Sequence, residues 1–296
     1  MTQTEVIDGG LGDDYIEAGF FSNGAGPSTS GIVVNGGDGD DTLSSNGIGS
    51  EFNGGDGNDL IDVAVNDTVT GGTGNDTISS IGDAVGDGGT GDDVLTGQRG
   101  DTHFGGAGND VLSGASSMSG GDGNDTISGY YELSGGDGDD LLTSYANPYA
   151  AGDGDALGIS GDAGNDTLTA SADIGYDNTP SVPGSFLGMS GGAGADVFDI
   201  QLDMSNPSHL PPSPTVPTQT STYLNIADFD PAEDVLTLQI NRDEEGADRE
   251  MILAEIVGNE VRMTFASTET DGEHSASIRL GSSVDVSIED IVFIQN

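Results

Sequence analysis

An aliphatic residue recurs at the centre of a three-residue segment at eight places between residues 9 and 143. Side chains alternate between the two faces of a strand, so the central residue of each triplet points inward and its neighbours point outward. Val94-Leu95-Thr96 and Val111-Leu112-Ser113 show the pattern. It predicts short strands whose buried residues are Ile16, Leu43, Ile61, Ile78, Leu95, Leu112, Ile127 and Leu142.

A glycine turn precedes each of these strands. The pattern Gly-Gly-x-Gly-[Asn/Asp]-Asp-x-[Ile/Leu]-x starts, without a mismatch, at Gly9, Gly36, Gly54, Gly71, Gly88, Gly105, Gly120 and Gly135. The starts are offset by 27, 18, 17, 17, 17, 15 and 15 residues, and a repeat of this length is typical of a solenoid. Each coil then holds the glycine turn, an outgoing strand, a second turn and a return strand.

The return strands supply a second inward column, two residues before the motif. Its members are Val34, Phe52, Val69, Met118, Leu133 and Met189. Val85 lies one residue too early and Phe104 falls out of phase, and nothing in the sequence explains these two exceptions.

The charge is extreme: 52 acidic and 5 basic residues leave a net charge of −47. A polyanion is a poor partner for nucleic acid, and no apolar run approaches the roughly 18 residues that span a bilayer. The first residues have neither a basic nor an apolar signal region, and there is no cysteine. Acidic, glycine-rich chains are commonly disordered, but the periodic apolar position favours a fold that forms when a cation neutralises the carboxylates.

The motif offers oxygen ligands at fixed positions. The sixth position is always aspartate, and two imperfect copies preserve it, so the predicted side-chain ligands are Asp14, Asp41, Asp59, Asp76, Asp93, Asp110, Asp125, Asp140, Asp166 and Asp196. The fifth position is expected to contribute a carbonyl or a side chain, or to serve only as a turn former, at Asp13, Asp40, Asn58, Asn75, Asp92, Asn109, Asn124, Asp139 and Asn165. Further carbonyl ligands are expected from Gly36, Gly54, Gly71, Gly88, Gly105, Gly120 and Gly135.

Carboxylate and carbonyl oxygens suit calcium, which accepts six to eight oxygens in irregular geometry. Zinc would require histidine or cysteine, and the histidines, His103, His209 and His274, are far apart in the sequence. We expect His103 to pack beside a turn or to face solvent.

The segments GGDGND at Gly54–Asp59 and Gly120–Asp125, and GGTGNDTIS at Gly71–Ser79, resemble the RTX (repeats-in-toxin, haemolysin-type) calcium-binding nonapeptide. The resemblance implies an all-β fold, a parallel β-roll in which calcium ions lie between successive glycine turns. The sixth-position carboxylate and carbonyls of positions one to five would form the shell. Because every second turn here is a short turn of another type, we expect a single row of several ions along one edge.

The pattern weakens after Thr143. The copy at Ala151–Ala156 has lost its sixth-position aspartate, and the copy at Gly161 has Asp162 in place of the second glycine. We expect a calcium-binding roll over residues 1–203 with insertions near 19–30 and 170–185, a proline-rich linker over 204–222, and a β-rich capping domain over 223–296. Within the cap, strands are expected near residues 234–240, 250–257, 261–265 and 277–280, with a hairpin turn at Gly258-Asn259.

Residues 226–234 and 288–294 resemble the C-terminal region of RTX proteins exported by type I secretion. The resemblance implies secretion from a Gram-negative bacterium, with the type I machinery as a partner during export. The leading hypothesis is a secreted or cell-surface calcium-binding protein that folds outside the cell. The alternatives are an extracellular lyase or epimerase acting on anionic polysaccharide, and an adhesin that binds a cell-surface or extracellular glycan, or ice. No catalytic residues separate themselves from the repeats, so we expect a binding or structural protein rather than an enzyme.

Overall fold

The structure is a computed structural model. It describes residues 5–18, 31–144, 157–173, 187–203, 221–241, 251–257, 260–265, 274–281 and 287–295. The chain divides into two compact units, Met1–Leu142 and Thr143–Asn296. No α-helix occurs in the described ranges, and none of their helices is long and apolar enough to cross a membrane.

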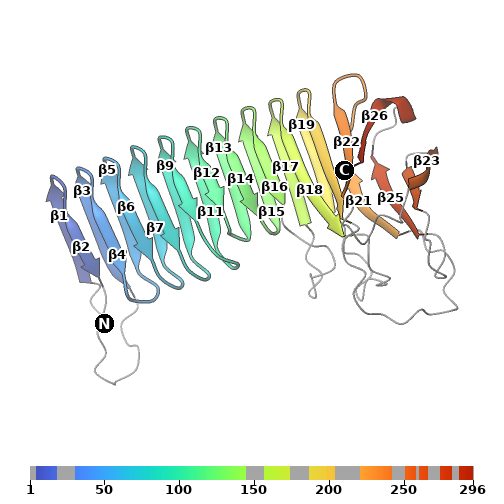
Figure 1. Ribbon diagram of the computed structural model, residues 1–296. Coiled ribbons are helices and arrows are strands. Elements are labelled where there is room, and N and C mark those ends of the chain that lie inside the picture. The colour runs from blue at the N-terminus through green and yellow to red at the C-terminus, as the bar shows by residue number, and fades with distance from the viewer. Residues whose placement is uncertain are drawn as a thin grey trace, which may run out of the picture. The chain divides into compact units, whose positions relative to one another are not determined.

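The first unit is a roll of two parallel sheets (Figure 1). One sheet is built from β1 (Glu5–Leu11), β3 (Ile32–Asp38), β5 (Glu51–Asp56), β7 (Thr68–Thr73), β9 (Val85–Thr90), β11 (Thr102–Ala107), β13 (Ser117–Asp122) and β15 (Glu132–Asp137). The other is built from β2 (Tyr15–Ala18), β4 (Thr42–Ser45), β6 (Leu60–Val63), β8 (Thr77–Ser80), β10 (Val94–Thr96), β12 (Val111–Ser113), β14 (Thr126–Gly129) and β16 (Leu141–Ser144). An odd strand, its glycine turn and the following even strand form one rung, and like strands of successive rungs pair in parallel, as β8, β10 and β12 do. The predicted parallel β-roll is confirmed.

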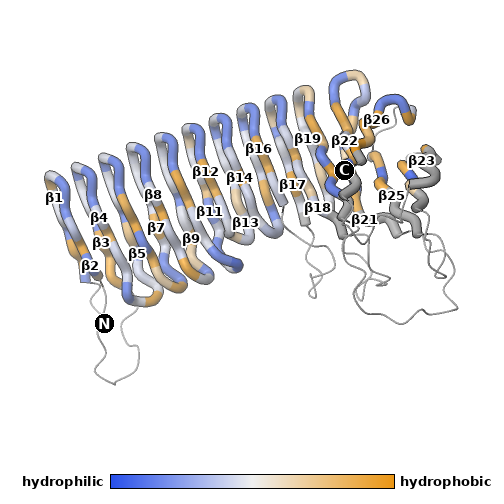
Figure 2. Tube along the Cα trace, in the orientation of Figure 1, coloured by the Kyte–Doolittle hydropathy of each residue, from blue (hydrophilic) through white to orange (hydrophobic). Residues whose placement is uncertain are grey.

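Two inward columns form the core of the first unit, as predicted, except that Ile16 in the first rung is only half-buried. Along the even strands, the inward side chains from Leu43 to Leu142 are at most 1 % exposed, whereas Thr96 faces solvent. Val34, Phe52, Val69, Met118 and Leu133 form the column of the odd strands. Hydrophobic residues accordingly recur along the strands in Figure 2, while the glycine turns are hydrophilic.

The register explains the two exceptions in this column. Thr102 pairs with Val85 and His103 pairs with Gly86, so Gly86 and His103 occupy the inward positions. Val85 and Phe104 therefore point outward, where they are 40 % and 45 % exposed. His103 is fully buried and packs against the turn at Gly97, so it packs beside a turn as expected but does not face solvent.

The second unit repeats the same two-sheet arrangement. Its strands are β17 (Leu157–Ala163), β18 (Thr167–Asp173), β19 (Leu187–Ala193), β20 (Val197–Asp203), β21 (Ser221–Ile226), β22 (Val235–Asn241), β23 (Met251–Val257), β24 (Glu260–Phe265), β25 (His274–Leu280) and β26 (Ile291–Gln295), with a 3₁₀ turn, η1, at Ile288–Asp290. β21 pairs in parallel with β19, and β22 pairs in parallel with β20. Part of the region expected as a cap therefore continues the roll as a further rung.

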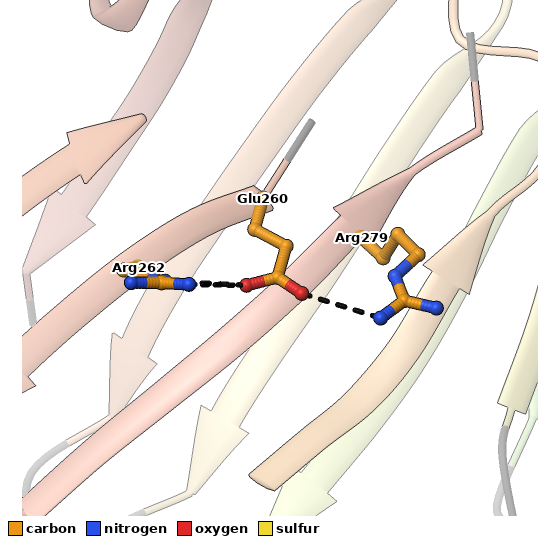
Figure 3. A network of polar contacts seen from close by, with 3 residues as sticks. All are labelled: Glu260, Arg262 and Arg279. Carbon is orange, nitrogen blue, oxygen red and sulfur yellow. Dashed lines mark hydrogen bonds and ion pairs between the residues drawn. The ribbon is translucent and has the colours of Figure 1, made fainter. Parts of the chain in front are cut away.

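The end of the second unit departs from the parallel pattern. β23, β24 and β25 form an antiparallel meander, and β25 also pairs in parallel with β21. On this meander Glu260 accepts hydrogen bonds from Arg262 at 3.0 Å and from Arg279 at 3.3 Å (Figure 3). These arginines hold the pKa of the Glu260 carboxyl below its usual range.

The predicted insertions fall mostly outside the described residues. Residues 19–30 and 174–186 are not described, and residues 170–173 belong to β18. The linker over 204–220, the imperfect turn at 151–156 and the hairpin turn at 258–259 also lie outside them. The antiparallel pairing of β23 with β24 agrees with the expected hairpin.

Candidate metal centre along the glycine edge

The glycine turns align along one edge of the first unit, called here the glycine edge. Positions two and four of the motif adopt positive φ, as at Gly89 (106°) and Gly91 (127°), where a side chain is strained. The imperfect copy keeps this conformation, because Asp162 takes φ 76° in place of the second glycine. The motif therefore specifies the backbone of each turn before any ligand is considered.

The sixth-position aspartates form a ladder that runs along this edge. The Oδ1 atom of each accepts a hydrogen bond from the backbone N–H of the sixth-position aspartate in the rung before it. Asp93 N–H donates to Asp110 Oδ1 at 2.7 Å, and Asp76 N–H donates to Asp93 Oδ1 at 2.7 Å. The ladder joins all eight perfect copies, and Asp166 and Asp196 form the same contact at 2.9 Å.

In seven of these carboxylates the second oxygen is buried and has no hydrogen-bond partner. This holds for Oδ2 of Asp14, Asp41, Asp59, Asp76, Asp93, Asp110 and Asp125. A buried carboxylate oxygen without a partner is costly, since burial removes its hydration and nothing replaces it. One such oxygen in each successive rung leaves a column of unsatisfied acceptors, and adjacent strands are spaced about 4.8 Å apart.

Burial raises the pKa of these groups. Desolvation is the main cause, and the neighbouring carboxylates add to it, whereas the backbone hydrogen bond opposes it. The pKa reaches about 6 for Asp76 and about 7 for Asp93 and Asp125, and it is also raised for Asp59, Asp110 and Asp196. The ionised ladder is therefore unfavourable unless a cation neutralises it.

The first glycine of the motif makes room for the carboxylate. A Cβ on Gly71 would lie against Asp76 Oδ2 and 2.5 Å from the carbonyl oxygen of Gly88, although the φ of Gly71 is not positive. Eight other first-position glycines from Gly9 to Gly191 are crowded by the sixth-position carboxylate in the same way. Position one is therefore glycine because a side chain would collide with the carboxylate. Positions two and four are crowded too, and they also adopt a positive φ that disfavours a side chain.

We expect Gly71→Ala to destabilise the calcium-loaded protein by about 1–3 kcal/mol, because the added methyl group displaces the Asp76 carboxylate or the next rung. Thermal unfolding in calcium measures the loss. Gly47→Ala is the matched control, since the nearest atom to its new Cβ beyond the adjacent residues would be Ser50 Oγ at 3.6 Å. Equal losses in the two variants would contradict this interpretation.

The fifth-position residues form a second, exposed ladder that runs in the opposite direction. Asp92 Oδ1 accepts the backbone N–H of Asn109 at 2.8 Å, and Asn75 Oδ1 accepts that of Asp92 at 3.0 Å. The contact recurs from Asp13 to Asp139 and from Asn165 to Ala195. These side chains hold neighbouring rungs together, which the sequence alone did not reveal.

The turns that join an even strand to the next odd strand form the second edge, and its aspartates differ in chemistry. Asp67 Oδ1 accepts the N–H of Ser50 at 2.7 Å, and its Oδ2 accepts that of Ala64 at 2.9 Å. Likewise, Asp101 Oδ1 accepts the backbone N–H of Ala84, and its Oδ2 accepts that of Gln98. Both oxygens of these carboxylates have donors, so they cap turns, and neither carboxylate has an unpartnered oxygen that needs a cation.

The donor set of the glycine edge fits a hard divalent cation. Within the described residues, no three acidic or histidine side chains converge on one point. Carbonyl oxygens of the glycine turns would therefore supply most of the shell, and the buried Oδ2 atoms would supply the charge. An all-oxygen set of this kind is typical of calcium.

The structure also brings together Ser80, Asp101 and His103, which the sequence did not connect. Ser80 Oγ donates to Asp101 Oδ2 at 2.9 Å and lies 2.9 Å from His103 Nε2. All three are at most 3 % exposed, and burial lowers the pKa of His103. The cluster includes a hydroxyl beside an imidazole, but it lies in the core, where no substrate reaches it.

Within the second unit, the ladder of Asp166 and Asp196 ends with a turn that has no glycine motif. Asp234 occupies the sixth position there, and its Oδ1 accepts the N–H of Asp196 at 3.0 Å. Its Oδ2 accepts the N–H of Asp230 at 2.7 Å, while Asp228 accepts hydrogen bonds from Gly191, Gly192 and Ser190. Unlike the repeats, this turn satisfies its carboxylate with its own backbone. The pairing of Val235 with Val197 shows that this turn corresponds to the glycine turns of the repeats. Its sequence differs too much from the repeated motif for a motif search to find it.

Asp234→Ala is expected to cost about 2–4 kcal/mol, because two backbone N–H groups lose their acceptor. The loss should be similar in calcium and in chelator, since this carboxylate needs no ion. Chemical denaturation under both conditions measures it, with the exposed Glu233→Ala in the same turn as the control. A loss seen only in calcium would show that Asp234 is a metal ligand.

Comparison with known proteins supports this assignment. The family model for the RTX calcium-binding nonapeptide repeat (4 copies) matches residues 4–23, 33–47, 63–80, 79–112, 113–130 and 159–174. Together with the parallel roll and its aspartate ladder, the match defines the class: the chain carries RTX calcium-binding nonapeptide repeats. Repeats of this family bind calcium, and the ladder is consistent with several ions.

Other comparisons are distant. The extracellular lipase LipA from Serratia marcescens aligns with 79 % of this chain at 16 % identity, with a TM-score of 0.19. The aligned part of this chain spans 40 % of that lipase chain. No curated protein sequence matches the chain.

Proposed function

We propose that this protein is a secreted calcium-binding β-roll that folds when it binds calcium outside the cell. The observation that carries the proposal is the column of buried Oδ2 atoms, each without a hydrogen-bond partner, in successive rungs. A divalent ion beside each atom would replace the lost hydration and neutralise the carboxylates, whose pKa values are raised when no ion is present.

Calcium is proposed to lie in one row, between successive glycine turns. The side-chain ligands are the sixth-position aspartates, and carbonyls of the glycine turns complete the shell. The fifth-position side chains are assigned a structural role, because their oxygens already accept backbone N–H groups. The single row is supported by the second edge, where both oxygens of Asp67 and of Asp101 have donors.

Folding outside the cell follows from the same chemistry. At low cytosolic calcium, the net charge of −47 and the buried carboxylates oppose folding and keep the chain extended for export. At high external calcium, binding to the folded state alone stabilises it in proportion to the logarithm of the free calcium concentration. The C-terminal resemblance to type I secretion substrates fits this order of events. A binding or structural role at the cell surface is the proposed biological setting.

Calcium titration tests the proposal. We expect the β-sheet signal in circular dichroism to be weak in chelator and to rise cooperatively with calcium, with several ions bound per chain in calorimetry. Magnesium at the same concentration should be much less effective, because it demands tighter octahedral geometry. The proposal fails if the chelated chain already has the full β-sheet signal, or if calcium binds without increasing it.

A further inference from the structure

The glycine edge alone does not determine which rung pairs with which. Every rung of the first unit offers the same glycine turn and the same sixth-position aspartate, and the inward residues Ile78, Leu95 and Leu112 are nearly interchangeable. β11 could therefore pair with β7 as readily as with β9, with one rung left out as a loop. Side chains elsewhere must discriminate between these arrangements.

The geometry points to the buried cluster around His103 as the device that selects the register. His103 lies directly over Gly86 in the paired strands β11 and β9. A Cβ on Gly86 would come within 3.1 Å of the His103 ring, and one on Gly97 within 2.6 Å of it. Neither glycine has a positive φ, so the backbone does not require glycine at either position. Both positions provide the space that the imidazole fills.

The hydrogen bonds of the cluster are equally specific. Because Asp101 accepts only, the Ser80 hydroxyl donates to it, so the neutral His103 must donate its Nε2 proton to Ser80. Asp101 in turn accepts the backbone N–H groups of Ala84 and Gln98. The partners come from three separate parts of the chain: the end of β8, the turn before β9 and the turn after β10.

A slip by one rung would break this set and add repulsion. With β11 on β7, His103 would face Val69 in place of Gly86, because Val69 pairs with Gly86 in the native register. Asp101 would lie over Asp67 in place of Ala84, since these residues precede Thr102, Thr68 and Val85. Two buried carboxylates would then be neighbours, and the backbone N–H of Asp67 would replace that of Ala84 as the donor to Asp101, so the new cost is the repulsion between the two charges. This alternation of acidic and non-acidic residues along the second edge disfavours the wrong register.

The chain has no cysteine, so engineered pairs report the register directly. Ser79 and Thr96 pair in the native register, and cysteines at these positions lie on adjacent strands within disulfide reach. Ser79 and Ser113 are two rungs apart, roughly 10 Å, and can form a disulfide only if the rung between them is left out. Folding is triggered with calcium under oxidising conditions, and peptide mapping gives the fraction of each disulfide.

When the cysteines are introduced into the protein with the native cluster, we expect the disulfide between positions 79 and 96 to form. The disulfide between positions 79 and 113 should not rise above the background level. Asp101→Ser with His103→Val should raise the 79–113 disulfide roughly tenfold, the change that about 1.4 kcal/mol of lost discrimination produces. Asp67→Ser leaves His103 untouched and removes the repulsion of the slipped register. The hydrogen bonds of Asp67 with Ser50 and Ala64, which it also removes, exist in both registers, so the variant should give a smaller rise. It also serves as the test if the double variant does not fold.

Ile127→Val is the control for a general loss of stability, because it weakens the core outside the cluster. The inference is overturned if both cluster variants leave the 79–113 disulfide at background, or if the control raises it equally. The calcium-induced circular dichroism of the same samples separates this result from a failure of calcium-driven folding, on which the test relies only as its trigger.

Discussion

Replacing Asp93 by asparagine is expected to have opposite effects on stability in calcium and in chelator. Asparagine keeps an oxygen that can accept the Asp76 N–H, but it removes the charge beside the buried Oδ2 position. In calcium, loss of a site that is filled at 100 times its dissociation constant costs about 2.7 kcal/mol. In chelator, the same change removes a buried charge that burial already disfavours, and we expect a gain on the order of 1 kcal/mol. Urea denaturation at neutral pH, with calcium and with chelator, measures both values.

Asp92→Asn is the matched control for this prediction. Asp92 is the preceding residue in the same turn, carries the same charge and also accepts a backbone N–H, but it is exposed. Its replacement should leave calcium-dependent stability within a few tenths of a kcal/mol, as for surface positions in general. If Asp92→Asn weakens calcium binding as much as Asp93→Asn does, the fifth position is a side-chain ligand and the assignment above is wrong.

Lowering the pH should partly replace calcium in stabilising the folded state, because protons neutralise the same buried carboxylates. In chelator, the pKa values of Asp76, Asp93 and Asp125 are about 6 to 7 in the folded state, against 3.8 for an ordinary aspartate. The folded state therefore binds more protons than the unfolded state between about pH 4 and 7, and stability falls as pH rises through this window. We expect the chelated protein to show more β-sheet signal at pH 5 than at pH 8.

Calcium affinity should change with pH in the opposite sense. Each ion must displace the proton from its ladder carboxylate, so affinity falls as pH falls below about 7 and binding releases protons. Calorimetry in buffers of different ionisation enthalpy counts these protons. Asp93→Asn should lower the count by removing one of the groups with a raised pKa. A chelated protein that loses structure on acidification, or calcium binding without proton release, would contradict the buried ladder.

The roll and its glycine edge could be predicted from the sequence alone. The fixed position of the aliphatic residue specified the inward column from Leu43 to Leu142, because alternation along a strand is a local property. The glycines at positions two and four specified the turns, because positive φ is also local. The invariant sixth-position aspartate then had to form a column once the rungs stacked.

The contacts of each carboxylate oxygen could be known only from the tertiary structure. The motif singled out Asp93, but it could not show that the Oδ2 of Asp93 is buried and unpaired while both oxygens of Asp101 are satisfied, because the difference lies in donors from other parts of the chain. It could not place His103 over Gly86 or Asp234 at the end of the ladder, since both depend on register between rungs. Local geometry is encoded within a few residues, whereas burial and hydrogen-bond partners across rungs exist only after the chain has stacked.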